Sequence, residues 1–358
     1  MKILILSPRL NITGGVSNFT KIFISYLSTD YKLVFRGSSN NDYFGPIGKT
    51  FRFCFDYFVF LGTLILWRPK VVFLNISFSK QSVYREFIYV FISKLFNKKV
   101  VVFWHGWNLD YEAQVDQNSN HFFRKWFKNI DLAFCLSQRF VDKLSQWGFQ
   151  YPILKTFTMI SNADVAEGDQ EFNSHELDHN TGFKFLWIGR MEEKKGLFEA
   201  IEIVEELNKR EIKASLIICG DGLLKAKLVD YLSEINKPYI AYKGLVFGEE
   251  KAKVFRDSNA LLFPSFSPEG MPTVIIEAIA YGLVVFTSPV GGIPDFFKKE
   301  MGVMFSINSI SSMVDEIIKY SETADRLQTS THNKKFAREN LFASVRVEFI
   351  EREIRKIC

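Results

Sequence analysis

Short apolar runs alternate with longer amphipathic stretches along most of this 358-residue chain. Residues 2–6 carry the continuous apolar pattern of a buried strand, glycines follow at positions 14 and 15, and apolar residues then recur at helical spacing. A strand, a glycine turn and a helix in this order are typical of the start of a doubly wound α/β domain. The same criteria predict further strands at 71–75, 100–104, 132–136 and 156–160, and helices at 81–96 and 138–147.

A polar, acidic segment at residues 166–182 interrupts this alternation and predicts a linker or an exposed loop. The pattern then restarts, with strands at 183–189, 214–219, 260–264 and 284–287 and helices at 197–209, 223–235, 273–281 and 345–357. We therefore predict an α/β protein with two doubly wound, Rossmann-like domains, 1–165 and 183–340, each a parallel sheet wrapped by helices. The last segment, 341–358, is expected to pack as a helix toward the first domain.

Composition narrows the class of protein. The 37 phenylalanines are scattered over many segments, so most of these rings are expected in the core. The four cysteines lack the spacing of a metal site and predict free buried thiols in a reducing compartment. The N-terminal apolar run stops at Ser7, too soon for a signal peptide. Asp56 interrupts the most hydrophobic stretch, 53–67, so no membrane-spanning helix is expected.

Basic residues concentrate in the first half of the chain. Residues 1–164 hold 20 Lys and Arg against 10 Asp and Glu, a net charge of +10, whereas the remainder has a net charge of −5. The predicted helix 81–96 combines apolar residues with nearby lysines, so it can either rest on an anionic membrane surface or pack into the domain core. No RNA-binding motif accompanies the basic charge, and we expect no nucleic-acid partner.

Loops that follow strands carry the candidate chemistry, because ligands bind at the carboxyl ends of strands in doubly wound sheets. Arg190 and Lys195 leave the strand at 183–189 together, and two cations can hold a diphosphate whose charge grows as a bond to it breaks. A solvated charged turn is the alternative interpretation. His105 follows another strand, where its ring can donate to a sugar oxygen or have a purely structural role.

Two glutamates stand close together in the segment FPSFSPEGMPTVIIEAIAYG. Glu269 lies in a loop, and Glu277 lies in an apolar helix that begins after Pro272 and therefore needs a partner for its charge. Carboxylates accept hydrogen bonds from vicinal hydroxyls, and N–H groups at a helix start donate to phosphate oxygens, so the segment suits a sugar nucleotide. This placement favours two contacts with one ligand over the acid/base pair of a glycosidase.

The turn at Gly14 and Gly15 excludes one class of enzyme. It is not a G-x-G-x-x-G motif, and no acidic residue stands at the ribose position after a second strand. These two features argue against a nicotinamide or flavin enzyme.

Taken in order, the motifs resemble those of the retaining glycosyltransferases of family four, whose GT-B fold has two Rossmann-like domains facing across a cleft. The segments that carry the resemblance span most of the chain and are strongest in its second half: GGVSNF, WHG, LSQRFVDKL, ISNADV, WIGRMEEKKG, CGDG, YKGLV and FPSFSPEGMPTVIIEAIAYGLVVFTSPVGGIPD. The chain departs from the family pattern where Ser161 and Ala163 replace a Pro and a Gly, and where Val284 replaces a common Pro.

The resemblance implies a role for each matched residue. Arg190 and Lys195 would hold the donor diphosphate, and Glu277 would bind the nucleotide ribose. His105 and Glu269 would contact the donor sugar and complete the catalytic set with the two cations. The remaining implied donor-binding residues are Gly15, Val246 and the backbone of Gly270, Met271, Pro272 and Thr273. The resemblance implies no metal ion and no other cofactor.

The sequence therefore predicts a retaining glycosyltransferase that moves a hexose from a UDP- or GDP-sugar to a lipid-linked or oligosaccharide acceptor in surface polysaccharide biosynthesis. We expect it in the cytoplasm, with peripheral attachment to the inner face of the plasma membrane left open. Two alternatives also stay open. One is a sugar-nucleotide epimerase or a phosphorylase of the same architecture, and the other is a non-catalytic protein that binds a glycan or another transferase.

Overall fold

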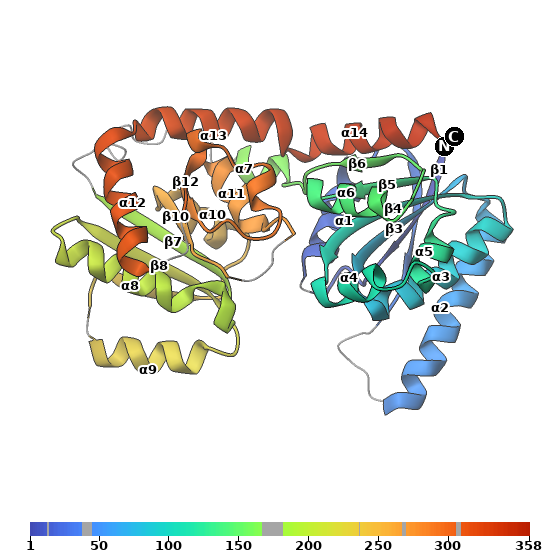
Figure 1. The fold of residues 1–358 in the computed structure, drawn as a ribbon, viewed down its shortest axis with the longest axis horizontal. Helices are drawn as coiled ribbons and strands as arrows, with labels where there is room; N and C mark the ends of the chain where they lie inside the picture. Colours follow the sequence, from blue (N-terminus) through green and yellow to red (C-terminus); the bar gives the residue numbers. More distant parts are fainter. Residues whose placement is uncertain (13, 38–44, 167–181, 236, 267–269, 306–308) are drawn as a thin grey trace. The chain divides into compact units, whose positions relative to one another are not determined.

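The computed structural model describes residues 1–12, 14–37, 45–166, 182–235, 237–266, 270–305 and 309–358. Its contacts divide the chain into two compact units (Figure 1). Unit 1 comprises Met1–Met159 and Ala343–Cys358, and unit 2 comprises Ile160–Phe342. The division between the units falls a few residues before the sequence placed it, and the C-terminal helix belongs to unit 1.

Unit 1 is a parallel sheet in the order β2-β1-β3-β4-β5-β6, with helices between successive strands. Its strands are β1 (Lys2–Ser7), β2 (Asp30–Phe35), β3 (Val71–Phe78), β4 (Lys99–Trp107), β5 (Leu132–Cys135) and β6 (Ile153–Lys155). Its helices are α1 (Gly15–Tyr26), α2 (Gly45–Trp67), α3 (Lys80–Leu95), α4 (Leu109–Asp116), α5 (Phe122–Phe127), α6 (Gln138–Gln146) and α14 (Ala343–Lys356).

Alternate side chains of this sheet face two layers of helices, as strand geometry requires. On one face, Phe73 and Phe103 contact Phe23 and Phe19 of α1, with ring centroids 5.1 and 4.5 Å apart. On the other face, Leu74 and Trp104 belong to a core cluster with buried residues of α2 to α6. The C-terminal helix is fixed to α1 because Glu351 of α14 accepts hydrogen bonds from the residues that follow α1, Ser28 and Thr29.

Unit 2 repeats the doubly wound arrangement with the strand order β12-β11-β10-β7-β8-β9, all parallel. Its strands are β7 (Phe183–Arg190), β8 (Ala214–Asp221), β9 (Ile240–Gly244), β10 (Ala260–Phe263), β11 (Val284–Thr287) and β12 (Gly302–Met304). Its helices are α7 (Asn162–Ala166), α8 (Leu197–Lys209), α9 (Lys225–Ile235), α10 (Gly248–Arg256), α11 (Thr273–Tyr281), α12 (Ile310–Thr323) and α13 (Arg326–Asn340), with 3₁₀ turns η3 (Glu193–Lys195), η4 (Ile293–Asp295) and η5 (Lys299–Met301). The two-domain α/β prediction is thus confirmed.

Two expectations from the sequence were wrong. The strand predicted at 156–160 is β6 at Ile153–Lys155, because the ladder with β5 ends where Thr156 N–H donates to the carbonyl of Cys135. Cys54 and Cys358 are exposed rather than buried, since one lies on the outward side of α2 and the other ends the chain. Most described phenylalanines are buried or half-buried, as expected, although Phe58 of α2 is 72% exposed. Within the described ranges, no helix is long and apolar enough to cross a bilayer.

Candidate functional site

The loops after β7 and β10 meet at the carboxyl edge of the unit 2 sheet. These strands are neighbours, and the chain continues from β7 toward β8 on one side and from β10 toward β11 on the other. The backbone carbonyl of Lys194 accepts hydrogen bonds from Phe266 N–H at 2.9 Å and from the Ser265 hydroxyl at 3.2 Å. The predicted phosphate loop and the start of the glutamate segment therefore lie side by side, at the point where a doubly wound sheet binds its ligand.

Two glycines allow this close approach of backbones. Gly196 has a φ of +72°, and a Cβ added there would lie 2.1 Å from the carbonyl oxygen of Pro264. Gly220, near the end of β8, has a φ of +140°, and a Cβ there would lie 1.9 Å from the carbonyl oxygen of Gly189. At both positions the backbone angle and the close contact disfavour any residue other than glycine. The loop that bears the two cations is thus held against the ends of its neighbouring strands.

The two predicted cations are presented differently. The Arg190 side chain is 75% exposed at the end of β7 and forms an ion pair with Glu192, 2.8 Å away. Lys195 is partly buried in the turn η3, and its carbonyl accepts a hydrogen bond from the Trp187 indole at 3.3 Å. An anionic ligand could draw Arg190 from its surface ion pair at small cost, because exposed pairs contribute little stability.

The segment from Gly270 to Thr273 forms the entry to α11. Pro272 is the residue before the helix, and in the described part of the chain no side chain caps its first N–H groups. The carbonyl of Gly270 accepts a hydrogen bond from Gly292 N–H at 3.1 Å, which fixes the direction of this entry. Met271 is buried and Thr273 begins the helix. The free N–H groups of such a helix start attract anions. Glu269, the other glutamate of this segment, lies outside the described residues.

Glu277 of α11 has the partner that its apolar surroundings require. Its carboxylate lies 2.7 Å from the ammonium of Lys251 on α10, and its side chain is 16% exposed. Val246, the predicted contact for the nucleotide base, lies in the short connection between β9 and α10. Because α10 also carries Lys251, the partner of Glu277, this helix links the predicted base contact to the predicted ribose contact. The sequence indicated that Glu277 needed a partner but did not identify Lys251, since nothing in the α10 sequence distinguishes this lysine from a solvated one.

In unit 1, His105 is fixed in one tautomer by Asn75. The Nε2 atom of His105 lies 2.9 Å from Asn75 Oδ1, while the amide nitrogen of Asn75 faces the carbonyl oxygen of Leu6 at 3.5 Å. Because that carbonyl can only accept, the Asn75 oxygen must face the histidine, and Nε2 therefore carries the proton. The ring presents Nδ1 as a hydrogen-bond acceptor, whereas the sequence suggested a donor.

The surroundings of His105 keep it neutral. Its ring stacks on Phe103, with centroids 4.4 Å apart, and meets the edge of Phe19 at 4.5 Å. Burial, together with the positive charge of Arg36, lowers the pKa of His105 to about 3. At neutral pH the imidazole thus offers a fixed hydrogen bond and no charge.

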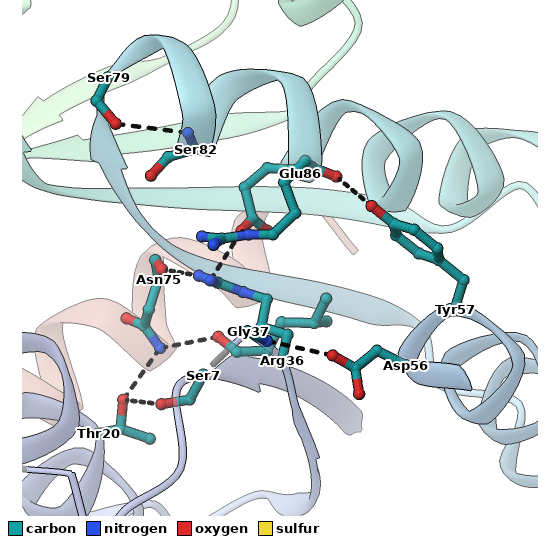
Figure 2. A network of polar contacts seen from close by, with 12 residues as sticks. Ser7, Thr20, Arg36, Gly37, Asp56, Tyr57, Asn75, Ser79, Ser82 and Glu86 are labelled. Carbon is teal, nitrogen blue, oxygen red and sulfur yellow. Dashed lines mark hydrogen bonds and ion pairs between the residues drawn. The ribbon is translucent and has the colours of Figure 1, made fainter. Parts of the chain in front are cut away.

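A buried ion pair supports the strand that carries Asn75 (Figure 2). The Arg36 guanidinium lies 2.8 Å from the Glu86 carboxylate, and it also donates to the backbone carbonyl of Asn75. Their side chains are 3% and 0% exposed. Among the described residues, Arg36 Nε and Glu86 Oε2 have no hydrogen-bond partner. Sequence reasoning missed these residues, although Asn75 interrupts an apolar strand and Glu86 falls on the buried face of α3.

The remaining predicted residue, Gly15, is also in unit 1. It is the first residue of α1, and a Cβ added there would meet no described atom within 4 Å. Phe19, one turn later, contacts the His105 ring, so Gly15 and His105 belong to the same edge of this unit. All the other described candidate residues lie in unit 2.

Comparison with known proteins finds a family model that matches most of the second half of the chain. Residues 169–338 match the family model described as glycosyl transferases group 1. An uncharacterized glycosyltransferase of Methanocaldococcus jannaschii, MJ1059, is 34% identical over 108 residues, which are 30% of this chain and 26% of that protein. The amylovoran biosynthesis glycosyltransferase AmsK of Erwinia amylovora is 26% identical over 57% of this chain and 50% of its own. The matches thus span half or less of these relatives' length.

A solved structure extends the similarity over the whole chain. Anabaena HepE, in complex with UDP and glucose, superposes with a TM-score of 0.68 over 99% of this chain and 100% of its own, at 13% identity. At this identity the similarity shows the fold, which is that of the GT-B glycosyltransferases. Together, the family match and the relatives support a glycosyltransferase of group 1.

Proposed function

We propose that this protein is a retaining glycosyltransferase that moves a hexose from a UDP- or GDP-sugar to a lipid-linked or oligosaccharide acceptor in surface polysaccharide biosynthesis. The observation that carries the proposal is the junction of the loops after β7 and β10, where Lys194 accepts hydrogen bonds from Ser265 and Phe266. This junction holds the loop that carries Arg190 and Lys195 against the chain that leaves β10. The name of AmsK, an amylovoran biosynthesis glycosyltransferase, and the UDP complex of HepE support the choice of substrate class.

In this proposal each group has one task. Arg190 and Lys195 hold the diphosphate and stabilise the charge that grows on it as the glycosidic bond breaks. The N–H groups at the start of α11 contact phosphate oxygens, and Glu277 accepts hydrogen bonds from the ribose hydroxyls. His105, neutral and fixed by Asn75, accepts a hydrogen bond from a hydroxyl of the donor sugar through Nδ1. No protein nucleophile is needed if the leaving phosphate takes the proton of the acceptor hydroxyl.

The test compares two neighbouring lysines. Replacing Lys195 with Ala should lower the release of nucleotide from the preferred donor by about a hundred-fold or more, because it removes a charge from the leaving group. Lys194→Ala is the matched control, since this exposed lysine uses only its backbone carbonyl at the junction and the variant should keep near-normal activity. Equal activity in both variants would contradict the role given to Lys195.

Ligand screening separates the remaining alternatives. In a thermal-shift panel of UDP-, GDP- and ADP-sugars, one donor at a hundred times its Kd should stabilise the fold by about 2.7 kcal/mol. Glu277→Ala should abolish this stabilisation. Turnover that depends on inorganic phosphate would instead indicate a phosphorylase, and turnover to free epimerised sugar without an acceptor would indicate an epimerase. Binding of a glycan without turnover of any donor would indicate a non-catalytic protein.

A further inference from the structure

Helix α2 of unit 1 carries an exposed apolar stripe. Its members recur every three or four residues, as a single helical face requires. The stripe consists of Phe55, Phe58, Val59, Gly62, Ile65 and Leu66. Phe58 is 72% exposed and Leu66 is 86% exposed, and a Cβ added at Gly62 would meet no described atom within 4 Å. The 12 positions from Phe55 to Leu66 give this face a length of roughly 17 Å.

Helix α3 of unit 1 also exposes apolar side chains, among them Leu95 by 65%. Other large side chains of α3 are partly covered by α5, since Tyr84 stacks on Phe122 at 4.5 Å and Phe87 packs on Trp126 at 4.8 Å. The acidic residue of α2, Asp56, is turned away from the stripe and accepts a hydrogen bond from Gly37 N–H. A contiguous exposed apolar face of this kind marks an interaction surface.

Positive charge gathers where the stripe ends. Helix α2 ends at Trp67, and the ammonium groups of Lys2 and Lys32 lie 5.5 and 5.4 Å from the centre of its ring. Because the strands are parallel, their first residues share one edge of the sheet. The cations on or beside this edge, here called the basic edge, are Lys2, Lys32, Arg68, Lys70 and Lys99.

Acidic residues only partly balance the basic edge. Asp30 is paired with Lys2 in the strand register, and Asp131 bonds Lys99 at 3.2 Å and also Lys94. Among the described side chains, five cations of the basic edge and Lys94 thus lie near two carboxylates, Asp30 and Asp131, so the side-chain charge there stays positive. An apolar helix face beside cations fits a surface that offers both acyl chains and anionic headgroups.

The same charges disfavour a second copy of the chain as the occupant. If two α2 helices packed side by side in parallel, one basic edge would meet the other. If they packed antiparallel, the basic edge would meet the first half of the partner helix, which carries Arg52. Like charges oppose each other in both arrangements, and anionic lipid opposes neither.

We propose that the α2 stripe and the basic edge dock unit 1 on an anionic lipid bilayer, with α2 lying in the plane of the interface. This docking does not depend on the proposed donor chemistry. Phe58, Ile65 and Leu66 enter the boundary between headgroups and acyl chains, while Arg68 and Lys70 contact lipid phosphates. The attachment is peripheral.

Co-sedimentation of the full chain with vesicles tests this proposal. Binding should be clear with equimolar phosphatidylglycerol and phosphatidylcholine, should weaken as salt rises, and should be much weaker with phosphatidylcholine alone. The Phe58→Ser/Leu66→Ser variant should bind about ten-fold less or weaker still, because two apolar anchors are lost. Both side chains are exposed, so the variant should keep its thermal midpoint and its donor turnover. Leu327→Ser, on unit 2 and 52% exposed, is the control and should bind as the parent chain does.

Two further measurements, of fluorescence on vesicles and of molar mass in solution, can contradict the proposal. A fluorophore on Cys54, beside the stripe, in a Cys358→Ser background should shift to the blue on anionic vesicles, and an unchanged spectrum would overturn the docking of α2. Light scattering measures the molar mass in solution. A dimer that the Phe58→Ser/Leu66→Ser variant dissociates, together with no binding to vesicles, would assign the stripe to a second copy of the chain.

Discussion

The candidate groups of the two units are held in opposite ways. In unit 1, His105 rests on Asn75, and Asn75 in turn rests on a buried ion pair between Arg36 and Glu86. In unit 2, the Arg190 side chain is 75% exposed, and the shape of its loop depends on glycines that let backbones touch. Unit 1 thus fixes the orientation of a neutral ring before any ligand arrives, while unit 2 offers charge that a ligand can meet. This difference predicts which substitutions destabilise each unit.

The largest effect should come from breaking the buried pair of unit 1. Arg36→Leu should lower the free energy of unfolding of this unit by about 3–5 kcal/mol, because Glu86 would keep a buried charge. Among the described ion pairs of Glu86, its buried carboxylate would keep that with Arg85, 2.9 Å away. Urea unfolding followed by tryptophan fluorescence measures this loss. The fluorescence reports unit 1, since five of the six tryptophans lie there.

A double replacement separates charge from packing. Arg36→Leu/Glu86→Leu should recover most of the stability, because no charge is then left buried. Lys356→Leu is the surface control in the same unit. Lys356 is 62% exposed in its ion pair with Glu353, so the change should stay within about 1 kcal/mol. An equal loss in the single and the double Arg36 variants would show that the pair matters through packing alone.

The second effect concerns the close approach of Gly196 to the backbone of Pro264 in unit 2. Gly196→Ala should destabilise this unit by about 2–3 kcal/mol more than Gly244→Ala, since both glycines have nearly the same φ but only Gly196 faces a carbonyl oxygen, that of Pro264. Hydrogen exchange of the β7 amides measures the opening of unit 2 by itself. Gly196→Ala should also weaken donor binding. Equal losses in the two variants would mean that backbone strain, and not the close approach, explains the glycine.

Most of the fold was predictable because its strands are strongly apolar. The strands near the middle of each sheet, such as β3, β4 and β7, have the continuous apolar runs of doubly covered strands. The strands that the sequence did not reveal, β2, β9 and β12, are paired on one side only and are shorter or more polar. Helix α2 was hidden for another reason, because its exposed face is as apolar as its buried face and gives no helical contrast.

The candidate site was predictable where its residues belong to a motif whose strand or helix can be recognised from the sequence. Arg190, Lys195 and Glu277 follow strands or sit in a helix that the pattern reveals, so their neighbourhood follows from the topology. Their partners could not be predicted in the same way. Lys251 meets Glu277, and Arg36 meets Glu86, only because separate elements pack together. Contacts between elements depend on tertiary packing, which no local pattern encodes.

The smallest expected effect is on the pH dependence of stability, which reports whether the His105 ring is uncharged in the folded unit. The unfolded chain takes up a proton on this residue near its ordinary pKa of 6.5, whereas the folded unit does so only near 3. Between these values the unfolded state binds more protons, so stability falls as the pH drops below about 6.5. From pH 7 to pH 5 this one group should remove about 2 kcal/mol from the unfolding free energy of unit 1.

The matched variant is His105→Gln, which can still donate to Asn75 but does not titrate. Its loss of stability from pH 7 to pH 5 should be about 2 kcal/mol smaller than that of the parent chain, in urea unfolding followed by tryptophan fluorescence. Parallel losses in the two proteins would mean that His105 becomes protonated in the folded state. The histidine would then offer a second donor in place of an acceptor, and unit 1 would resemble unit 2 in presenting charge to its ligand.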